Sequence, residues 1–298
     1  MLETLVQIQT PARLPDWLRK PDRHHESVQR IRQHLRGLRL HTVCESARCP
    51  NLHECFHRGT ATFMILGDLC TRGCGFCAVP KAKTPPPPDP DEPANVARMA
   101  ALLGLRHVVI TSVNRDDLPD GGAAHFARTI VAVRRRLPHA RIEALTPDFC
   151  GNLNAVAAVL EAGPDIFNHN VETVPRLYRR VRPQARYEQS LEVLRFAKQR
   201  QPDRLTKSGL MLGLGEQPAE VEALLHDLRA AEVDIVTIGQ YLQPTRRNLP
   251  VARYVEPAEF EAWRRYGLAL GFRYVWSGPL VRSSYMADAI SEEAGARA

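Results

Sequence analysis

Residues 62–77 read TFMILGDLCTRGCGFC, an apolar segment that leads into a glycine-rich loop with three cysteines. The apolar segment over 62–66 predicts a buried β-strand, and the glycines let the loop wrap closely around a bound group. Cys70, Cys74 and Cys77, here called the downstream triplet, have the spacing C-x3-C-x2-C. A 4Fe–4S cluster normally takes four thiolates, one per iron, so a triplet leaves one iron open to another ligand.

A second set, the upstream triplet, consists of Cys44, Cys49 and Cys55, so six of the seven cysteines fall within residues 44–77. Without an evident secretory signal, clustered cysteines bind metal more often than they form disulfides. We therefore expect two 4Fe–4S clusters, each with one position open. The alternative is a zinc site, which usually takes four ligands and has His53 and His57 available near the upstream triplet.

The bulk properties of the chain fit a globular protein of one barrel or two ordinary domains. It has 298 residues, 44% of them hydrophobic, and a formal net charge of +7. Its apolar runs are far shorter than the ~18 residues of a membrane span, and the first residues do not read as a secretory signal. We expect a cytoplasmic protein that does not associate with membranes. The positive charge suits an acidic protein partner, whereas no nucleic-acid-binding module is evident, so nucleic acid is not expected.

Strand-like and helix-like segments alternate through most of the chain. Predicted strands cover 62–66, 107–111, 141–145, 165–168, 207–212, 234–238 and 273–276, and predicted helices cover 95–103, 123–137, 153–161, 187–200, 218–231 and 257–270. This alternation indicates parallel βαβ units with right-handed crossovers. We predict an α/β fold, a partial (β/α)6-type TIM-like barrel with N-terminal and C-terminal extensions. A doubly wound open sheet is the structural alternative.

The chain divides into three predicted regions. Residues 1–60 form an N-terminal extension with the upstream triplet, and apolar spacing predicts a helix over 27–40. Residues 61–276 form the barrel, and 277–298 form a tail. The proline-rich stretch 84–93 predicts an extended connector.

The motifs together resemble one enzyme family. The downstream triplet, with Phe76 before its last cysteine, resembles the signature of radical S-adenosylmethionine (SAM) enzymes. The upstream segment CESARCPNLHEC over 44–55, followed by GTATFM over 59–64, is similar to lipoyl synthases. The similarity continues in VVITSVNRDDL (108–118), NHNVETV (168–174), VRP (181–183), KSGLMLGLGE (207–216) and RSSY (282–285). It spans roughly residues 40 to 286.

The resemblance implies distinct roles for the two triplets. The downstream triplet would hold the cluster that cleaves SAM to a 5′-deoxyadenosyl radical, and the upstream triplet would hold an auxiliary cluster that supplies two sulfur atoms. The fourth ligand of the auxiliary cluster would be Ser283, with an ordinary tail hydroxyl as the alternative. A serine oxygen is a hard ligand for iron beside soft thiolates, which suits an iron that must be released. Arg282 would tune this cluster or contact the substrate.

Candidate SAM contacts come from the same motifs. Phe76 belongs to the cluster loop, and four further candidates follow predicted strands or lie in the quoted motifs: Ser112, Asn170, Glu172 and Arg182. We interpret Glu172 as a ribose acceptor, with an ion pair to neighbouring arginines as the alternative. Cys150 lies outside both triplets and is interpreted as a buried structural thiol. A cationic run is either a solvated helix face or a surface that attracts an acidic carrier domain; it comprises Arg176, Arg179, Arg180, Arg182 and Arg186.

The implied activity is sulfur insertion at carbons six and eight of an octanoyl chain on a lysine of a lipoyl carrier domain. The implied carriers are 2-oxoacid dehydrogenase acyltransferase subunits and the glycine cleavage H protein. Ferredoxin or flavodoxin would supply electrons, and an iron–sulfur carrier would repair the auxiliary cluster. The alternatives are a biotin-synthase-like sulfur inserter, an RNA methylthiotransferase and a zinc-stabilised nucleic-acid-binding protein. The upstream spacing and the RSSY serine argue against the first two.

Overall fold

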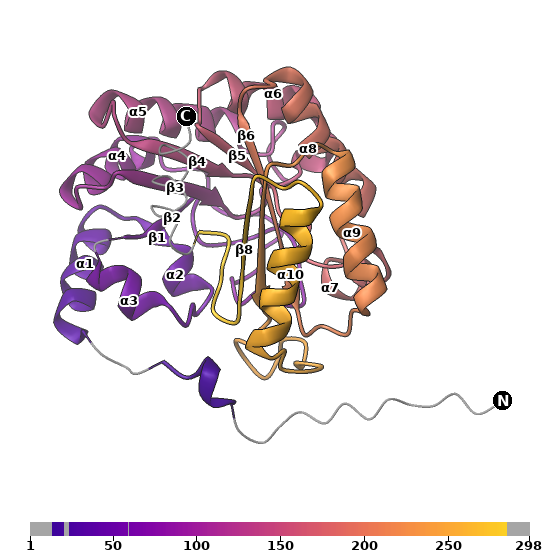
Figure 1. The fold of residues 1–298 in the computed structure, drawn as a ribbon. Coiled ribbons are helices and arrows are strands. Elements are labelled where there is room, and N and C mark those ends of the chain that lie inside the picture. Colours follow the sequence, from indigo (N-terminus) through magenta and orange to yellow (C-terminus); the bar gives the residue numbers. More distant parts are fainter. Residues whose placement is uncertain (1–13, 21–23, 59, 285–298) are drawn as a thin grey trace.

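A sheet of parallel strands forms the centre of the protein, whose computed structural model describes residues 14–20, 24–58 and 60–284 (Figure 1). Each strand pairs in parallel with the next along the chain. The strands are β2 (Thr62–Ile65), β3 (His107–Ser112), β4 (Arg141–Leu145), β5 (Ile166–Asn168), β6 (Leu205–Leu212), β7 (Ile235–Gln240) and β8 (Tyr274–Gly278). The sequential order confirms the partial barrel, since a doubly wound sheet reverses its winding direction.

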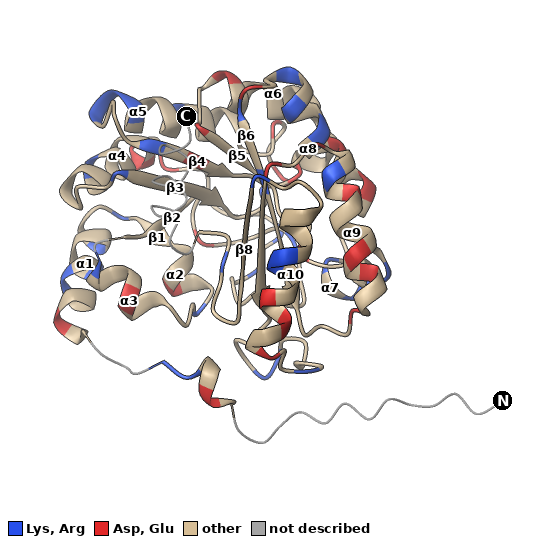
Figure 2. Ribbon diagram, in the orientation of Figure 1, with Lys and Arg blue, Asp and Glu red and all other residues tan. Residues whose placement is uncertain are grey.

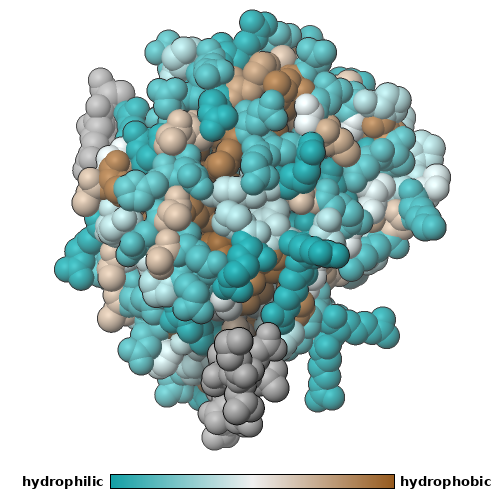
Figure 3. Space-filling view, turned by 90° about the vertical axis from the view of Figure 1, so that its right-hand side faces the viewer, coloured by the Kyte–Doolittle hydropathy of each residue, from teal (hydrophilic) through white to brown (hydrophobic). Residues whose placement is uncertain are grey.

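Amphipathic helices connect the strands and cover the outside of the sheet. They are α4 (Glu92–Leu102), α5 (Ala123–Arg136), α6 (Leu153–Glu161), α8 (Tyr187–Arg200), α9 (Pro218–Ala230) and α10 (Pro257–Ala269), with a short α7 (Tyr178–Val181) before α8. The described residues also form the short 3-10 turns η1 (Asp16–Leu18), η2 (Phe149–Gly151) and η3 (Pro175–Leu177). Figure 2 shows charged residues along these outer helices, and Figure 3 shows a largely hydrophilic face with separate hydrophobic patches.

The N-terminal extension joins the same sheet through a strand that the sequence did not predict. It contains α1 (His25–Gly37), β1 (His41–Thr42), α2 (Val43–Ser46) and α3 (Leu52–His57). β1 pairs antiparallel with β2, with Thr42 opposite Phe63. The hydroxyl of Thr42 then accepts from the backbone N–H of Glu45 at 3.4 Å, which caps α2. The first cysteine of the upstream triplet, Cys44, therefore lies two residues after the end of β1.

The tail returns along β6 and β7 to the N-terminal extension. Asn51 Nδ2 donates to the carbonyl oxygen of Leu280 at 2.8 Å. A Cβ atom on Gly239 of β7 would lie 2.2 Å from the carbonyl oxygen of Val281, so only glycine leaves room for the tail at this point. The extension and the tail, which are far apart in sequence, thus meet at the barrel.

The proline-rich connector is shorter than the sequence predicts. The expectation of an extended stretch over 84–93 is wrong at its end, because α4 begins at Glu92 and includes Pro93. Proline is tolerated in a first helical turn, where its missing N–H would have no partner within the helix.

Among the described residues, no helix is both long and apolar enough to cross a membrane.

Candidate functional site

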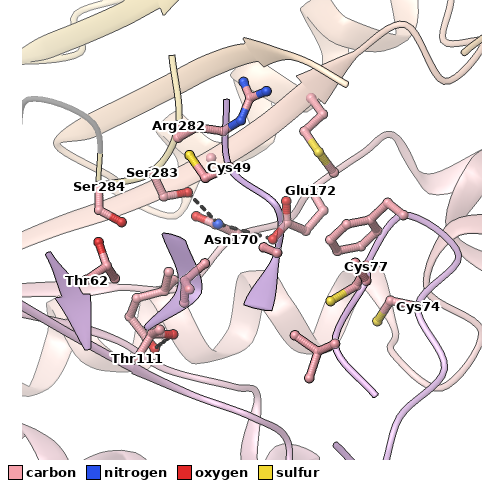
Figure 4. Close-up of a pocket in the computed structure, with 18 of the residues that line it drawn as sticks. Cys49, Thr62, Cys74, Cys77, Thr111, Asn170, Glu172, Arg282, Ser283 and Ser284 are labelled. Carbon is pink, nitrogen blue, oxygen red and sulfur yellow. Dashed lines mark hydrogen bonds between the residues drawn. The ribbon is translucent and has the colours of Figure 1, made fainter. Parts of the chain in front are cut away.

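One cavity of about 570 Å³ brings together both cysteine triplets. All six of their cysteines line it, and none of them forms a disulfide. The other predicted site residues also line it: Phe76, Ser112, Asn170, Glu172, Arg182, Arg282 and Ser283. Figure 4 shows Cys74 and Cys77 toward one end and Cys49, Arg282 and Ser283 toward the other, with Asn170 and Glu172 between them.

The loop of the downstream triplet is anchored to the barrel by backbone contacts. The Sγ atom of Cys70 accepts from the backbone N–H groups of Arg72 and Asn114, both at 3.4 Å. At the other end of the loop, Asn248 Nδ2 donates to the carbonyl oxygen of Cys77 at 2.9 Å. A Cβ atom on Gly75 would lie 2.8 Å from Leu249, so the close fit of this loop requires glycine here.

Arg72, inside the downstream triplet's loop, forms a buried ionic network. Its guanidinium donates to Asp116 at 2.7 and 2.9 Å, and to Asp148 at 2.6 and 2.9 Å. The side chains of Arg72 and Asp148 are 4% and 0% exposed. Burial alone would raise the pKa of Asp148, but the Arg72 hydrogen bonds and charge lower it to about 2. The network ties the loop to the segments that follow β3 and β4.

The interpretation of Cys150 as a buried thiol is wrong, because this residue is exposed. Phe149, Cys150 and Gly151 have φ values of 46°, 54° and 81°, so η2 is a left-handed turn. Here the Cys150 Sγ donates to Asp116 Oδ1 at 3.2 Å and accepts from Arg72 Nη2 at 3.3 Å. Cys150 therefore lies at the exposed edge of the Arg72 network.

The thiols of each triplet influence one another. Burial, together with the neighbouring Cys49 and Cys55, raises the pKa of Cys44 to about 12. Burial, followed by Cys49, raises the pKa of Cys55 to about 11. In the downstream triplet, burial raises the pKa of Cys77 to about 11, with contributions from its two partner cysteines. Iron binding must displace these protons, so cluster loading depends on pH.

Asn170 stands at the centre of the cavity and contacts the tail. Its Nδ2 donates to Ser283 Oγ at 2.6 Å and to Glu172 Oε1 at 3.1 Å. Glu172 has φ of 66°, a strained value for a residue other than glycine, and such strain is concentrated at functional sites. Burial raises the pKa of the Glu172 carboxyl, while Arg182 and Asn170 oppose that shift.

Several lining residues carry buried polar atoms without a hydrogen-bond partner: Asn51 Oδ1, Ser112 Oγ, Asn114 Oδ1, His169 Nε2, Asn170 Oδ1 and Arg182 Nε. Buried polar groups are nearly always paired in folded proteins, so such a concentration on one cavity indicates a polar ligand. The six thiols supply the soft sulfur donors that iron–sulfur clusters require. The lining therefore fits both an iron–sulfur group and a polar cofactor.

No group of three or more His, Cys, Asp or Glu side chains in the described part of the chain is arranged to hold a single metal ion. A cubane binds each thiolate through a different iron, so its ligands lie farther apart than those around one zinc ion. His53 and His57, the candidate zinc ligands, contact other rings instead. His53 packs edge-on against His25, and His57 stacks on His24.

The cationic run does not form one continuous solvated face. Arg182 is buried, and its Nη1 donates to the carbonyl oxygens of Asn170 and Val171 at 2.9 and 3.3 Å. Arg176 is exposed and pairs with Glu220 at 2.7 Å. Arg179, Arg180 and Arg186 are exposed. Only Arg182 of this run reaches the cavity.

Sequence reasoning missed several residues that shape the cavity. Arg72, Asn114, His169 and Gly209 all lie in quoted motifs, yet they were given no individual role. Asn51, two residues after Cys49 in the CESARCPN segment, donates a hydrogen bond to the tail at Leu280. The available signal was therefore motif membership, which does not say which atoms a residue contacts.

His169 predicts a specific pH dependence of stability. Its Nδ1 lies 2.9 Å from the Thr146 carbonyl oxygen, so Nδ1 carries the proton and donates, and burial lowers the pKa of the ring from 6.5 to about 4. Below pH 6.5 the unfolded chain binds a proton that the folded chain excludes, so stability falls as pH falls. When the pH is lowered from 7 to 5, we expect the unfolding free energy to fall by about 2 kcal/mol because of this residue.

Chemical denaturation of the wild type and of His169→Asn at both pH values measures this effect. An asparagine amide can still donate to Thr146 but does not titrate in this range. We expect the variant to lose less stability than the wild type on acidification. Equal losses in the two proteins would show that His169 is not the titrating group.

Comparisons with known proteins agree with the geometry of the site. Residues 64–228 match the model of the radical SAM superfamily, and residues 4–49 match the N-terminal domain of lipoyl synthase. The chain is 56% identical over 280 residues to a lipoyl synthase of Rubrobacter xylanophilus, covering 94% of this chain and 87% of that protein. It is 54% identical to the chloroplastic lipoyl synthase of Arabidopsis thaliana, covering 92% of this chain and 71% of that one.

Two solved structures share the fold. Methylornithine synthase aligns with a TM-score of 0.56 at 16% identity, over 71% of this chain and 62% of that one. HydG, a maturase of the [FeFe]-hydrogenase, also aligns with a TM-score of 0.56, at 12% identity, over 84% of this chain and 62% of that one. At these identities the likeness concerns the fold alone.

Proposed function

Because the chain belongs to the lipoyl synthase family of radical SAM enzymes, we propose that it inserts sulfur at carbons six and eight of an octanoyl chain carried on a protein lysine. The family takes a 4Fe–4S cluster and SAM. One observation carries the finer proposal, namely that two cysteine triplets and Ser283 line a single cavity. Two such donor sets in one cavity suit a reaction in which one bound group generates a radical on the substrate and the other supplies sulfur to it.

The downstream triplet is the proposed site of the SAM-cleaving cluster. When bound, this cluster supplies the electron that cleaves SAM and so generates the radical that removes hydrogen from the acyl chain. The protein's contribution is to orient SAM and exclude water. Ser112 Oγ and Arg182 Nε are unpartnered groups that suit the SAM carboxylate, and the Glu172 carboxylate suits the ribose hydroxyls. Phe76, in the cluster loop, adds an apolar ring to the lining of the cavity.

The auxiliary cluster enters the proposed reaction as a substrate that gives up two sulfur atoms. The upstream triplet supplies three of its ligands and Ser283 the fourth. A hard serine oxygen matches iron less well than a thiolate, so this corner is the one most readily released. Arg282 lies close enough to Cys49 for their charges to interact, which suits a role in stabilising the bound cluster.

The octanoyl chain must reach the space between the triplets, which calls for apolar walls. The cavity has such residues from several strands and from the tail: Met64, Leu145, Leu210, Met211 and Val281. The octanoyl-lysine arm would come from a lipoyl carrier domain, either a 2-oxoacid dehydrogenase acyltransferase subunit or the glycine cleavage H protein. Exposed Arg179, Arg180 and Arg186 would favour an acidic carrier. Ferredoxin or flavodoxin would supply electrons, and an iron–sulfur carrier would restore the auxiliary cluster.

Anaerobic turnover tests this proposal directly. The reconstituted protein is incubated with SAM, a strong reductant and an octanoyl-lysyl peptide, and the products are identified by mass spectrometry. We expect 5′-deoxyadenosine together with a peptide that carries two added sulfur atoms. Deoxyadenosine with an unchanged peptide would contradict sulfur insertion into this substrate. A protein that contains its iron yet forms neither product would contradict the proposed chemistry as a whole.

A further inference from the structure

We propose that Asn170 is a positioning residue that holds Ser283 in the orientation needed to bind the auxiliary cluster. The inference rests on the proposed function, in which Ser283 is the fourth ligand. The two residues are 113 positions apart in sequence, yet Asn170 Nδ2 and Ser283 Oγ are 2.6 Å apart (Figure 4). Asn170 lies just after β5, on the rigid barrel, whereas Ser283 belongs to the tail.

Glu172 determines which end of the Asn170 amide faces the serine. Asn170 Nδ2 donates to Glu172 Oε1 at 3.1 Å, so the nitrogen end of the amide is the end that faces Glu172. The same nitrogen contacts Ser283, and its second N–H is therefore directed to the serine oxygen. Glu172 is itself fixed, because its backbone N–H donates to the Gly209 carbonyl oxygen and its own carbonyl oxygen accepts from Met211, both at 2.9 Å.

The hydrogen bond restricts how Ser283 can meet iron. A hydroxyl oxygen has two lone pairs, and one of them is directed at the amide donor. The remaining lone pair and the O–H bond must then point elsewhere, so the direction available for metal binding is defined before the cluster arrives. Metal ligands are commonly oriented by such outer hydrogen bonds, whose loss weakens metal binding by about 10- to 100-fold.

Gly209 of β6 provides the space in which these groups meet. A Cβ atom there would lie 2.9 Å from Asn170 Oδ1, 3.1 Å from Ser283 Oγ and 2.6 Å from Thr237 Oγ1. The backbone of Gly209 is outside the left-handed region, so glycine is needed here for room. Together with Gly239 beneath Val281, it lets the tail approach the strands closely enough for Asn170 to reach the serine.

Iron release from the auxiliary site provides the test. A full-length background with Cys70→Ala, Cys74→Ala and Cys77→Ala leaves only the upstream triplet, so Asn170 cannot act through SAM. Each reconstituted protein is mixed anaerobically with EDTA, and loss of the first iron is followed by absorbance, iron analysis and electron paramagnetic resonance. The variants are Asn170→Ala, the isosteric Asn170→Asp, Ser283→Ala and the double variant N170A/S283A. Thr111→Val is the control, because Thr111 lines the same cavity and its hydroxyl donates to the Leu145 carbonyl oxygen at 2.8 Å rather than to Ser283.

We expect both Asn170 variants to release the first iron about tenfold faster than the background, which is the lower end of the range for losing an outer partner of a metal ligand. S283A should release it faster still, and N170A/S283A should match S283A, because Asn170 acts through the serine. T111V should match the background. Rapid release by S283A with background rates in both Asn170 variants would overturn the positioning role alone. A double variant clearly faster than S283A would also overturn it. A background rate in S283A would instead overturn the ligand assignment in the proposed function.

Discussion

Cys74→Ala is expected to abolish both SAM cleavage and sulfur insertion, whereas Cys49→Ala is expected to abolish sulfur insertion alone. Cys74 belongs to the triplet proposed to hold the SAM-cleaving cluster, and its loss leaves that cluster without a required ligand. Deoxyadenosine formation should fall by more than about a hundredfold. Losing a hydrogen-bond partner of a metal ligand lowers activity by about 10- to 100-fold, and losing the ligand itself should lower it more. Cys49 belongs to the triplet proposed to hold the sulfur-donating auxiliary cluster, so its variant should still form deoxyadenosine.

Both products are measured by mass spectrometry in one anaerobic assay. Cys150→Ala is the matched control, because Cys150 is exposed and is not among the residues that line the cavity. It should retain both activities. Loss of both activities in the Cys49 and Cys74 variants alike, with C150A active, would contradict separate roles for the two triplets.

Arg72→Met is expected to destabilise the protein by about 3–5 kcal/mol, because it leaves the buried carboxylate of Asp148 without its partner. Asp148 is fully buried, and the Arg72 guanidinium contacts it through two hydrogen bonds of 2.6 and 2.9 Å. Anaerobic denaturation of the holoprotein, followed by circular dichroism, measures the change. The variant should also lose iron from the downstream triplet more readily, since Arg72 lies inside that loop.

Two controls separate the buried charge from a general effect of losing an arginine. The Arg200–Glu161 pair has exposed fractions of 56% and 62%, so Arg200→Ala should cost less than about 1 kcal/mol. The double variant R72M/D148N removes both charges and should recover part of the lost stability. An effect of R72M no larger than that of R200A would show that the network contributes little to the fold.

The sequence predicted the barrel well because its elements have strong periodic patterns. Three predicted elements have the same bounds as observed ones: the strand over 141–145 is β4, and the helices over 153–161 and 187–200 are α6 and α8. β1 was missed because His41–Thr42 is too short for any periodicity to show, and it exists only through pairing with β2. Residue patterns thus identified helices and strands long enough to show a repeating pattern. They did not identify β1, which forms only through its contact with β2.

The composition of the site was predictable from motifs, whereas its contacts were not. Every predicted site residue lines the cavity, although the roles given to them remain predictions. Arg72 meets Asp148 across 76 positions, and Asn170 meets Ser283 across 113. Such contacts depend on how the strands and tail are arranged in space. Cys150 was wrongly predicted because its exposure follows from a left-handed turn that residue type alone does not indicate.

The iron and sulfide content of reconstituted protein tests the central claim of two clusters most directly. Wild-type protein should bind about eight irons and eight sulfides per chain, two 4Fe–4S clusters. Replacing all three cysteines of either triplet by alanine should leave about four of each, because the other triplet remains intact. A wild-type content of about four, unchanged when the upstream triplet is removed, would contradict the account.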